Sequence, residues 1–191
     1  MKPLYIVTNL HRSGSSMLMR CLEAGGLTPV YDKLSDTMNH SAPSDYIPNP
    51  NGFYQFTGQI NPSFYEQYKS NLIKYPIKSI TNLPIGNYKV ILLLRDPKEI
   101  RKSMDKWTPY SSWGMDEAIT YIYDKFINEV KKYLIKRKDV ELLILNYKDI
   151  VNSPLESFTV IQSAGWPIDI NKCVSNVDAS LYRNKLEKDK K

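Results

Sequence analysis

Short apolar runs alternate with amphipathic segments along most of the chain. The runs LYIVTNL (4–10), KVILLL (89–94) and VELLILNY (140–147) are rich in Ile, Val and Leu, which is typical of strands buried in a parallel sheet. After the first run, apolar residues recur at helical spacing at Met17, Leu18, Cys21 and Leu22. This alternation predicts an α/β domain with a mainly parallel central sheet, flanked by helices and joined by right-handed crossovers.

Capping signals mark the boundaries of the predicted helices. Start signals that combine Asn, Asp or Ser with a following Pro occur at Asn61–Pro62, Asp96–Pro97 and Ser153–Pro154, and the last two add Glu99 and Glu156 as capping-box acids. The first of them predicts a helical stretch over 61–73. Glycines that end helices stand at Gly25, Gly26 and Gly165. A longer amphipathic helix is predicted over 115–137, with one apolar face made of Ile119, Ile122, Phe126, Val130, Tyr133 and Leu134.

The segment 29–61 is too long and too irregular to be a simple connection. It is rich in Asn, Asp, Ser, Pro and aromatic residues, and loops of this length often act as lids or binding loops. We expect one domain over residues 1–191, with 29–61 as its lid or acceptor loop. The last residues, 184–191, form a basic C-terminal tail.

Composition and charge narrow the class of protein. The 191 residues are 42% hydrophobic and 24% charged, as in ordinary globular domains, and the formal charge of +6 favours an anionic ligand. Two cysteines and two histidines without ligand spacing argue against a disulfide framework or a structural metal. No run reaches the ~18 apolar residues of a membrane span, and the start does not resemble a signal peptide. We therefore expect a cytoplasmic protein.

The turn HRSGSS, which follows the first predicted strand, has the composition of an anion-binding loop. Unpaired N–H groups at a helix start attract anions, and Gly14 lets the backbone approach one closely. Ser13, Ser15 and Ser16 add hydroxyl donors, and Arg12 adds a forked cation that suits phosphate or sulfate. The lysine of the ATP-binding loop G-x-x-x-x-G-K-[ST] is missing, so a magnesium–triphosphate fits poorly. Plain helix capping by the serines is the alternative.

Three motifs in order resemble those of the sulfotransferase family. RSGSS resembles the 5′-phosphosulfate loop of the family, and LLLRDPKEIRKSM resembles its 3′-phosphate motif, in which a serine follows an arginine as Ser103 follows Arg95. LLILNYKDIVNSPLESFTVIQSAGW resembles a later segment of strand, tyrosine, acidic turn and helix. The resemblance spans about residues 4–170, with RSGSS, LLLRDPKEIRKSM and the later segment in family order. LEAGG and NPNGFY also resemble small bacterial and phage sulfotransferase-like proteins.

The resemblance implies a three-layer P-loop-type fold and a nucleotide donor. The donor would be 3′-phosphoadenosine 5′-phosphosulfate (PAPS), with 3′-phosphoadenosine 5′-phosphate (PAP) as product and no metal required. The residues that it implies for nucleotide binding are Arg12, Ser13, Gly14, Ser15, Ser16, Arg95, Ser103, Tyr147 and Arg183. Arg12 would face the bridging oxygen and the sulfuryl group, while Arg95 and Ser103 would hold the 3′-phosphate and Arg183 would close over it. A purely structural role for Tyr147, at the end of a strand, is an equal alternative.

The resemblance leaves the catalytic base and the acceptor open. KSITNLP resembles the segment that carries a catalytic histidine, but Asn82 stands in its place, and Gln55 stands where small relatives often have an acid. The remaining candidates for the base are His40, Asp36, Asp45 and Glu66, of which His40 has the best-suited ordinary pKa. Lys78 is a candidate for assisting the sulfuryl group. The acceptor would carry a hydroxyl or an amine, and aromatic residues either face it or pack in the core: Tyr46, Phe53, Tyr54, Phe56, Trp107, Tyr110 and Trp113.

Three other functions stay open at the level of sequence. A nucleotide or small-molecule kinase would use the loop and Arg95 for ATP, although the G-K-[ST] element is absent. A non-catalytic protein would bind a nucleotide or a partner only, which Asn82 and Gln55 favour. A nucleic-acid-binding protein would use the basic surface, but no zinc-finger or RNP-type sequence is present, so we expect no nucleic-acid partner.

Overall fold

The computed structural model describes residues 2–38, 52–107 and 116–186. The strands are β1 (Leu4–Asn9), β2 (Leu72–Lys74), β3 (Tyr88–Leu94) and β4 (Val140–Asn146). The longer helices are α1 (Ser15–Ala24), α3 (Pro62–Tyr68), α4 (Pro97–Trp107), α5 (Asp116–Lys136) and α7 (Pro154–Ser163). The shorter helical segments are α2 (Lys33–Met38), α6 (Tyr147–Asn152), α8 (Ile170–Ser175), η1 (Ile77–Asn82) and η2 (Ala179–Leu181).

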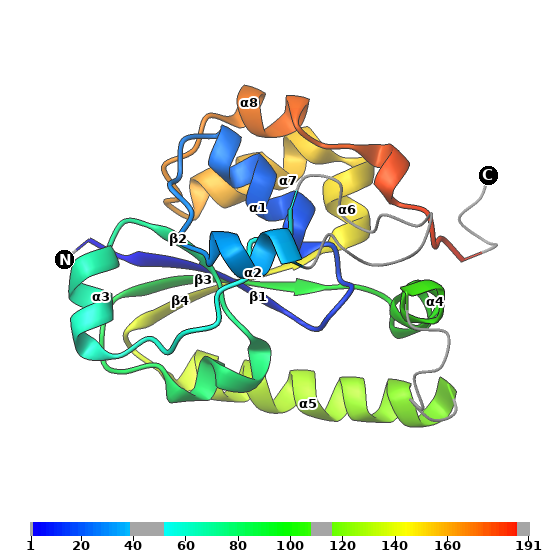
Figure 1. Cartoon of the computed structure of the whole chain (residues 1–191), viewed down its shortest axis with the longest axis horizontal. Coiled ribbons are helices and arrows are strands. Elements are labelled where there is room, and N and C mark those ends of the chain that lie inside the picture. Colours follow the sequence, from blue (N-terminus) through cyan, green and yellow to red (C-terminus); the bar gives the residue numbers. More distant parts are fainter. Residues whose placement is uncertain (1, 39–51, 108–115, 187–191) are drawn as a thin grey trace.

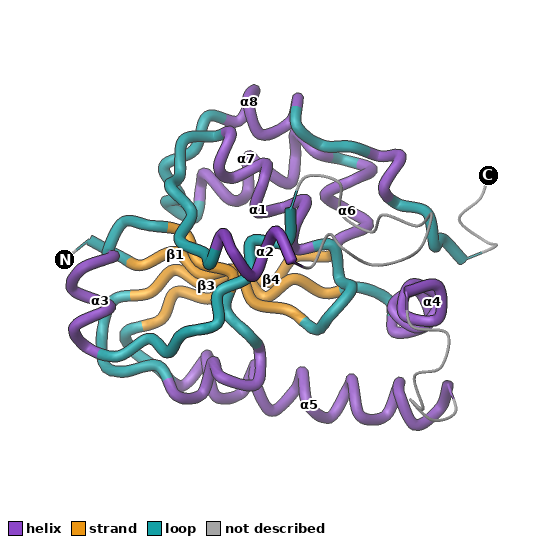
Figure 2. The backbone as a smooth tube through the Cα atoms, in the orientation of Figure 1, coloured by secondary structure: helices purple, strands orange, loops and turns teal. Residues whose placement is uncertain are grey.

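The strands form one parallel sheet in the order β2-β1-β3-β4. Figure 2 shows the sheet in orange between the helices. Val7 of β1 lies between Lys74 of β2 and Ile91 of β3, and Ile91 lies beside Leu143 of β4. All the strands therefore end at the same edge of the sheet, where ligands bind in open α/β folds. This carboxyl edge carries the loop after β1, the end of β2 and Arg95, the residue after β3.

Helices cover both faces of the sheet, so the molecule has three layers (Figure 1). Successive strand residues point to opposite faces, so β1 contributes to two apolar clusters. Val7 packs with Leu18 and Phe158 under α1, α6, α7 and α8. Ile6 packs with Leu134 on the other face, which α5 covers. The predicted three-layer α/β fold with a parallel central sheet is confirmed.

The strand β2 is missing from the sequence prediction, which makes 61–73 helical throughout. Asn61 caps α3 as predicted, and its Oδ1 accepts from the N–H of Phe64 at 2.8 Å. The helix nevertheless ends at Tyr68, and Ser70 adopts a φ of 76°. A residue in the left-handed region cannot continue a right-handed helix, so the chain turns back into the sheet.

Two further expectations are corrected at β4 and at the helix starts. β4 is an edge strand rather than a fully buried one, and Ile144 is 39% exposed. Asp96 caps α4 by accepting from the N–H of Lys98 at 2.8 Å, but Glu99 pairs with a buried arginine instead of completing a capping box. Ser153 precedes α7 without a side-chain hydrogen bond to its first turn in the described part of the chain.

The long helix α5 matches the predicted amphipathic helix. Val130 and Leu134 are buried as predicted, and Tyr123 and Ile127 complete the buried face. Phe126 and Tyr133 are half-buried, and the side chains of Ile119 and Ile122 lie outside the described residues. Within the described ranges, no helix has the length and apolar character needed to cross a bilayer.

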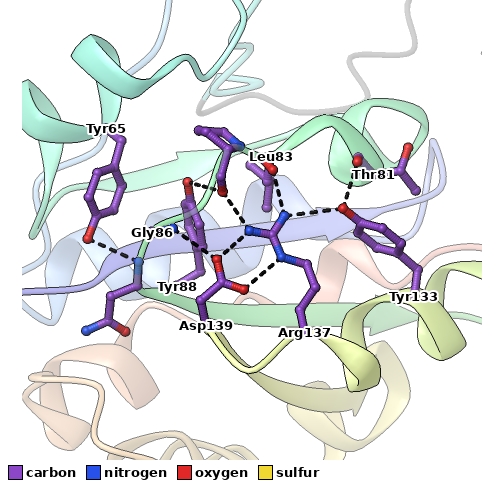
Figure 3. Close-up of polar contacts among 10 residues, drawn as sticks. Tyr65, Thr81, Leu83, Gly86, Tyr88, Tyr133, Arg137 and Asp139 are labelled. Carbon is purple, nitrogen blue, oxygen red and sulfur yellow. Dashed lines mark hydrogen bonds and ion pairs between the residues drawn. The ribbon is translucent and has the colours of Figure 1, made fainter.

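An arginine network fixes the opposite, amino-terminal edge of the sheet (Figure 3). Arg137, between α5 and β4, donates from Nε to Asp139 Oδ1 at 2.9 Å and from Nη1 to the carbonyl oxygen of Leu83 at 2.7 Å. Asp139 also accepts from the N–H of Gly86 at 2.9 Å. The network therefore ties the chain before β3 to the chain before β4.

Candidate functional site

The loop between β1 and α1 contains two residues in the left-handed region. Arg12 has a φ of 66° and Gly14 a φ of 88°, and α1 begins at Ser15. A Cβ at Gly14 would also lie 2.2 Å from ring atoms of Tyr147, so the ring packs directly against this glycine. The loop thus bends around a buried tyrosine and places the unpaired N–H groups of α1 directly after it.

Arg12 joins the two predicted anion motifs. Its Nε donates to Ser103 Oγ at 3.0 Å, although the two residues are 91 positions apart. Ser103 lies in α4 and is only 2% exposed. The loop between β1 and α1 and the helix after β3 therefore meet at the carboxyl edge. The hydrogen bond to Ser103 comes from Arg12, whereas the sequence motif pairs Ser103 with Arg95.

Arg95 is held in place by a carboxylate, a backbone carbonyl and two aromatic rings. Its Nε donates to Glu99 Oε2 at 2.9 Å, and its Nη1 donates to the carbonyl oxygen of Arg12 at 3.0 Å. Its guanidinium carbon lies 4.9 Å from the ring centroid of Tyr147 and 5.4 Å from that of Tyr182. The Tyr182 hydroxyl donates to Glu99 Oε1 at 2.7 Å. Arg95 therefore holds the left-handed Arg12 in position and connects the loop to the C-terminal part of the chain.

Buried polar atoms without a hydrogen-bond partner point to a ligand at this edge. Among the described residues, three buried side-chain atoms lack a partner: Ser13 Oγ, Arg95 Nη2 and Asn184 Oδ1. An unpaired buried polar group costs about 1–3 kcal/mol, so its presence in a native fold calls for an explanation. Ser13 and Arg95 both belong to the set predicted to hold the donor. Oxygen atoms of an anion would satisfy both, so these residues fit the nucleotide that the sequence motifs imply.

Lys74, at the end of β2, belongs to the site although no sequence motif points to it. Its Nζ lies 3.4 Å from Ser16 Oγ and donates to the carbonyl oxygen of Phe53. Burial lowers the pKa of Lys74 to about 8, while the carboxylate of Asp36 raises it and the charge of Arg12 lowers it further. A lysine at the carboxyl end of a strand beside β1 is the signal that could have revealed it, had β2 been recognised.

His11 and Lys78 extend the positive charge around the loop. Partial desolvation is the main cause that lowers the pKa of the His11 imidazole. The charges of Lys74, Lys78 and Arg12 lower it further. Both His11 and Lys78 are exposed. Cationic side chains from the loop, from β2 and from η1 therefore converge at one end of the sheet, which favours an anion of more than one charge.

The structure describes two of the predicted base candidates, Asp36 and Glu66, and each already has hydrogen-bond or ion-pair partners. Asp36 is buried and accepts hydrogen bonds from backbone N–H groups of the segment 53–55. Glu66, on α3, forms an exposed ion pair with Lys69, the residue directly after this helix. His40 and Asp45 lie outside the described residues. The structure therefore gives Asp36 a structural task and places Glu66 in an exposed pair.

The segment 78–84 leads from the loop toward the opposite edge of the sheet. Lys78 is close enough to act on the charge of the loop histidine. Asn82 is exposed, and the carbonyl oxygens on either side of it accept from Tyr133 and Arg137 (Figure 3). Asn82 therefore belongs to the fixed amino-terminal edge.

Tyr147 is buried, whereas Arg183 is exposed to solvent. Tyr147 is the first residue of α6 and is buried beneath the loop. Burial raises the pKa of Tyr147 to about 12, against the charges of Arg95 and Arg183. Arg183 is exposed beside the buried Tyr182. Tyr147 therefore packs beneath the loop. The charge of Arg183 is close enough to lower the pKa of the Tyr147 hydroxyl.

Aromatic residues of the predicted acceptor set pack in the core wherever the structure describes them. Phe53 and Tyr54 are buried, and the Tyr54 hydroxyl donates to Glu23 Oε2 at 2.5 Å. The Phe56 ring lies 5.0 Å from that of Phe64. Tyr46, Tyr110 and Trp113 lie outside the described residues, as does the side chain of Trp107.

A pocket of about 390 Å³ opens between the ends of β3 and β4. Its charged lining residues are Arg95, Asp96, Glu99, Lys148 and Asp149. Carboxylates outnumber cations in this lining, so the pocket as a whole carries less positive charge than the surroundings of His11, Lys74 and Lys78. No group of three or more His, Cys, Asp and Glu side chains within the described ranges could hold a metal ion.

Comparison with known proteins supports the fold. Neither the protein-family models nor the curated proteins give a match to the sequence. Among solved structures, the mouse sulfotransferase SULT7A1 complexed with PAP is similar, with a TM-score of 0.54 and 13% identity over 98% of this chain and 69% of that chain. The sulfotransferase domain from the curacin biosynthetic pathway is also similar, with a TM-score of 0.54 and 15% identity over 98% of this chain and 93% of that domain. The chain therefore has the sulfotransferase fold.

Proposed function

We propose that the chain is a PAPS-dependent sulfotransferase that acts on a hydroxyl or amine of its acceptor. The observation that carries this proposal is the hydrogen bond from Arg12 to Ser103, which joins the two anion motifs at the carboxyl edge. The unpartnered Ser13 Oγ and Arg95 Nη2 support it, because each belongs to one of these motifs. A protein of the same fold has been solved with PAP.

Each side chain of the site has a task in this proposal. The donor supplies an activated sulfuryl group. Ser13, Ser15 and Ser16 bind its 5′ end together with the first N–H groups of α1, which Gly14 lets it approach. Arg12 and Lys74 supply the positive charge that stabilises the leaving oxygen as negative charge develops on it.

The remaining residues of the proposed site bind the nucleotide or assist the acceptor. Arg95 and Ser103 bind the 3′-phosphate, Arg183 closes over it, and Tyr147 supports the loop beneath. His40 is the proposed proton acceptor for the incoming hydroxyl, and Lys78 assists the sulfuryl group. No metal is assigned a task in this scheme.

Calorimetric titration with PAP, ADP and ATP, each with and without magnesium, tests the proposal. We expect magnesium-independent binding of PAP that is at least about tenfold tighter than binding of ADP, because only PAP offers a 3′-phosphate to a charge-assisted hydrogen bond. Arg12→Gln should weaken PAP binding, whereas Lys138→Gln, at an exposed lysine beyond α5, should not. Preference for ATP with magnesium would indicate a kinase, and binding of none of the three would favour a non-catalytic protein.

A further inference from the structure

The backbone of Phe53 is held on both sides of its Cα, at its N–H and at its carbonyl oxygen. Its N–H donates to both carboxylate oxygens of Asp36, at 2.9 and 3.1 Å. Its carbonyl oxygen accepts from Ser16 Oγ at 3.3 Å and from Lys74 Nζ. Asp36 also accepts from the N–H of Gln55 at 3.2 Å. One backbone unit thus connects a carboxylate on α2 to the hydroxyl and the ammonium group at the phosphate loop.

The Asp36 carboxylate is buried and packs closely against the backbone at Gly52 and Phe53. Asp36 is 8% exposed, and a buried carboxylate needs hydrogen-bond donors and a nearby positive charge to be stable. Gly52 has a φ of 94°, and a Cβ there would lie 2.7 Å from Asp36 Oδ2. A side chain at this position would therefore meet both backbone strain and the carboxylate itself.

The Phe53 carbonyl accepts from two donors that an anion oxygen could also use. It accepts from one hydroxyl of the phosphate loop and from the ammonium group of Lys74. A phosphate or sulfate oxygen makes stronger, charge-assisted hydrogen bonds to the same donors. An incoming anion therefore meets Ser16 and Lys74 already gathered at one point.

We infer that Asp36 is a positioning residue of the anion site, which holds Lys74 and Ser16 at the phosphate loop through the backbone N–H and carbonyl group of Phe53. The identity of the anion as a sulfuryl donor rests on the proposed function. The role of Asp36 differs from that of a catalytic base, because both of its oxygens accept backbone hydrogen bonds.

Asp36 also acts on the charge of Lys74. Among the described residues, Asp36 from α2 and Arg12 from the loop act on the charge of Lys74, and Lys74 in turn acts on His11. Burial and Arg12 lower the pKa of Lys74, while Asp36 raises it. An anion binds the protonated lysine, so its affinity is fully present below the pKa of about 8 in the free protein and falls as pH rises through it. Without the carboxylate, this fall should move to lower pH.

Calorimetric titration with PAP between about pH 6.5 and about pH 9.5 tests the inference, because this window lies on both sides of the Lys74 pKa of about 8. We expect wild-type affinity to fall by about tenfold across this window, which is the worth of one charge-assisted hydrogen bond. Asp36→Asn should lower the affinity and shift the midpoint of the fall to lower pH, and Lys74→Met should abolish the fall. Glu156→Gln, an exposed acid on α7, is the matched control and should behave as wild type.

The outcomes separate a positioning role from a structural one. An Asp36→Asn variant that binds more weakly at an unchanged midpoint would assign Asp36 to structure alone and overturn the inference, as would unchanged binding. If wild-type protein binds no PAP, the proposed function fails, and the same pH series with pyrophosphate as the probe decides the inference.

Amide hydrogen exchange of the ligand-free protein gives a readout that does not depend on any nucleotide. In Asp36→Asn, the amides of Phe53 and Gln55 should exchange at least about tenfold faster, because each loses a charge-assisted acceptor. The amides of Val7 and Leu92, inside the sheet, should keep their protection. Unchanged exchange at Phe53 would show that Asp36 does not hold the backbone of this residue and would overturn the inference.

Discussion

At the carboxyl edge, the buried charge of Arg95 is paired with that of Glu99. The side chains of Arg95 and Glu99 are 7% and 3% exposed and form an ion pair with Nε to Oε2 at 2.9 Å. Breaking a buried pair leaves one uncompensated charge and costs more than replacing both partners. Binding and stability are therefore coupled at Arg95, and an alanine there changes both.

A double substitution separates the two effects. We expect Arg95→Ala to reduce the free energy of unfolding by about 3–5 kcal/mol, because Glu99 stays buried without its cation. Arg95→Met combined with Glu99→Gln should recover most of this loss in chemical denaturation. Both proteins should bind PAP no better than adenosine 5′-phosphate. A double variant that keeps a full preference for PAP would show that Arg95 does not bind the 3′-phosphate.

Gly14 offers a second test at the residue scale. Gly14→Ala combines a left-handed backbone with a Cβ that would lie 2.2 Å from the Tyr147 ring, so we expect a loss of more than about 1 kcal/mol in the free energy of unfolding. Gly26→Ala is the matched control, because its φ is 112° and nothing lies within 4 Å of the added Cβ. Equal losses in thermal unfolding for the two variants would contradict the close packing of Tyr147.

At the scale of elements, long-range pairing decides what the sequence can predict. The runs of β1 and β3 carry their signals locally, so the parallel sheet follows from them. The turn HRSGSS carries a local signal too, and its anion-binding role stays a prediction. β2 has three residues and becomes a strand only by pairing with β1. The position of Lys74 in the site depends on that pairing. The contact of Asp36 with Phe53 depends on how the chain between them returns to α2. Neither could therefore be predicted from local sequence.

The connection between α5 and β4 predicts how stability depends on pH. The hydrogen bond from Arg137 lowers the pKa of Asp139 to about 2, below its ordinary value of about 3.9. A depressed carboxylate pKa stabilises the fold above the unfolded value, and this contribution is lost as pH falls through about 4 toward 2. We expect Asp139→Asn to lose on the order of 1 kcal/mol at pH 7, because solvent screens this partly exposed ion pair, and to flatten this part of the stability profile, measured by urea denaturation.

Glu141→Gln is the control for that profile. Glu141 pairs with Lys89 across β3 and β4 but is largely exposed, so its replacement should change stability little at any pH. A profile for Asp139→Asn that runs parallel to wild type below pH 4 (roughly the unfolded carboxyl pKa) would contradict the assigned role of the network.

At the scale of the whole molecule, α1 and α8 share a buried interface that contains both cysteines. Cys21 and Cys173 are fully buried and unpaired by a disulfide. Burial raises the pKa of the Cys21 thiol to about 12 and that of Cys173 to about 11. Neither thiol is therefore a reactive thiolate in the folded protein.

Thiol labelling should therefore report the opening of the fold. We expect negligible reaction with an aromatic disulfide reagent at pH 8 (about the pKa of a free thiol) in native conditions, and reaction of both cysteines after denaturation. The labelling rate should rise with urea in proportion to global unfolding. Fast labelling of native protein, with Cys173→Ser identifying the reacting thiol, would show that α8 opens separately from the rest.

The contacts of Arg12 with Ser103 and of Tyr182 with Glu99 have a consequence for protein synthesis. They join residues 91 and 83 positions apart, so the anion site combines an early, a middle and a late part of the chain. Contacts of such separation form late in folding because long loops must close first. A growing chain on the ribosome therefore lacks the finished site until Tyr182 has emerged. Nucleotide binding would then distinguish molecules that contain Tyr182 from molecules that end before it.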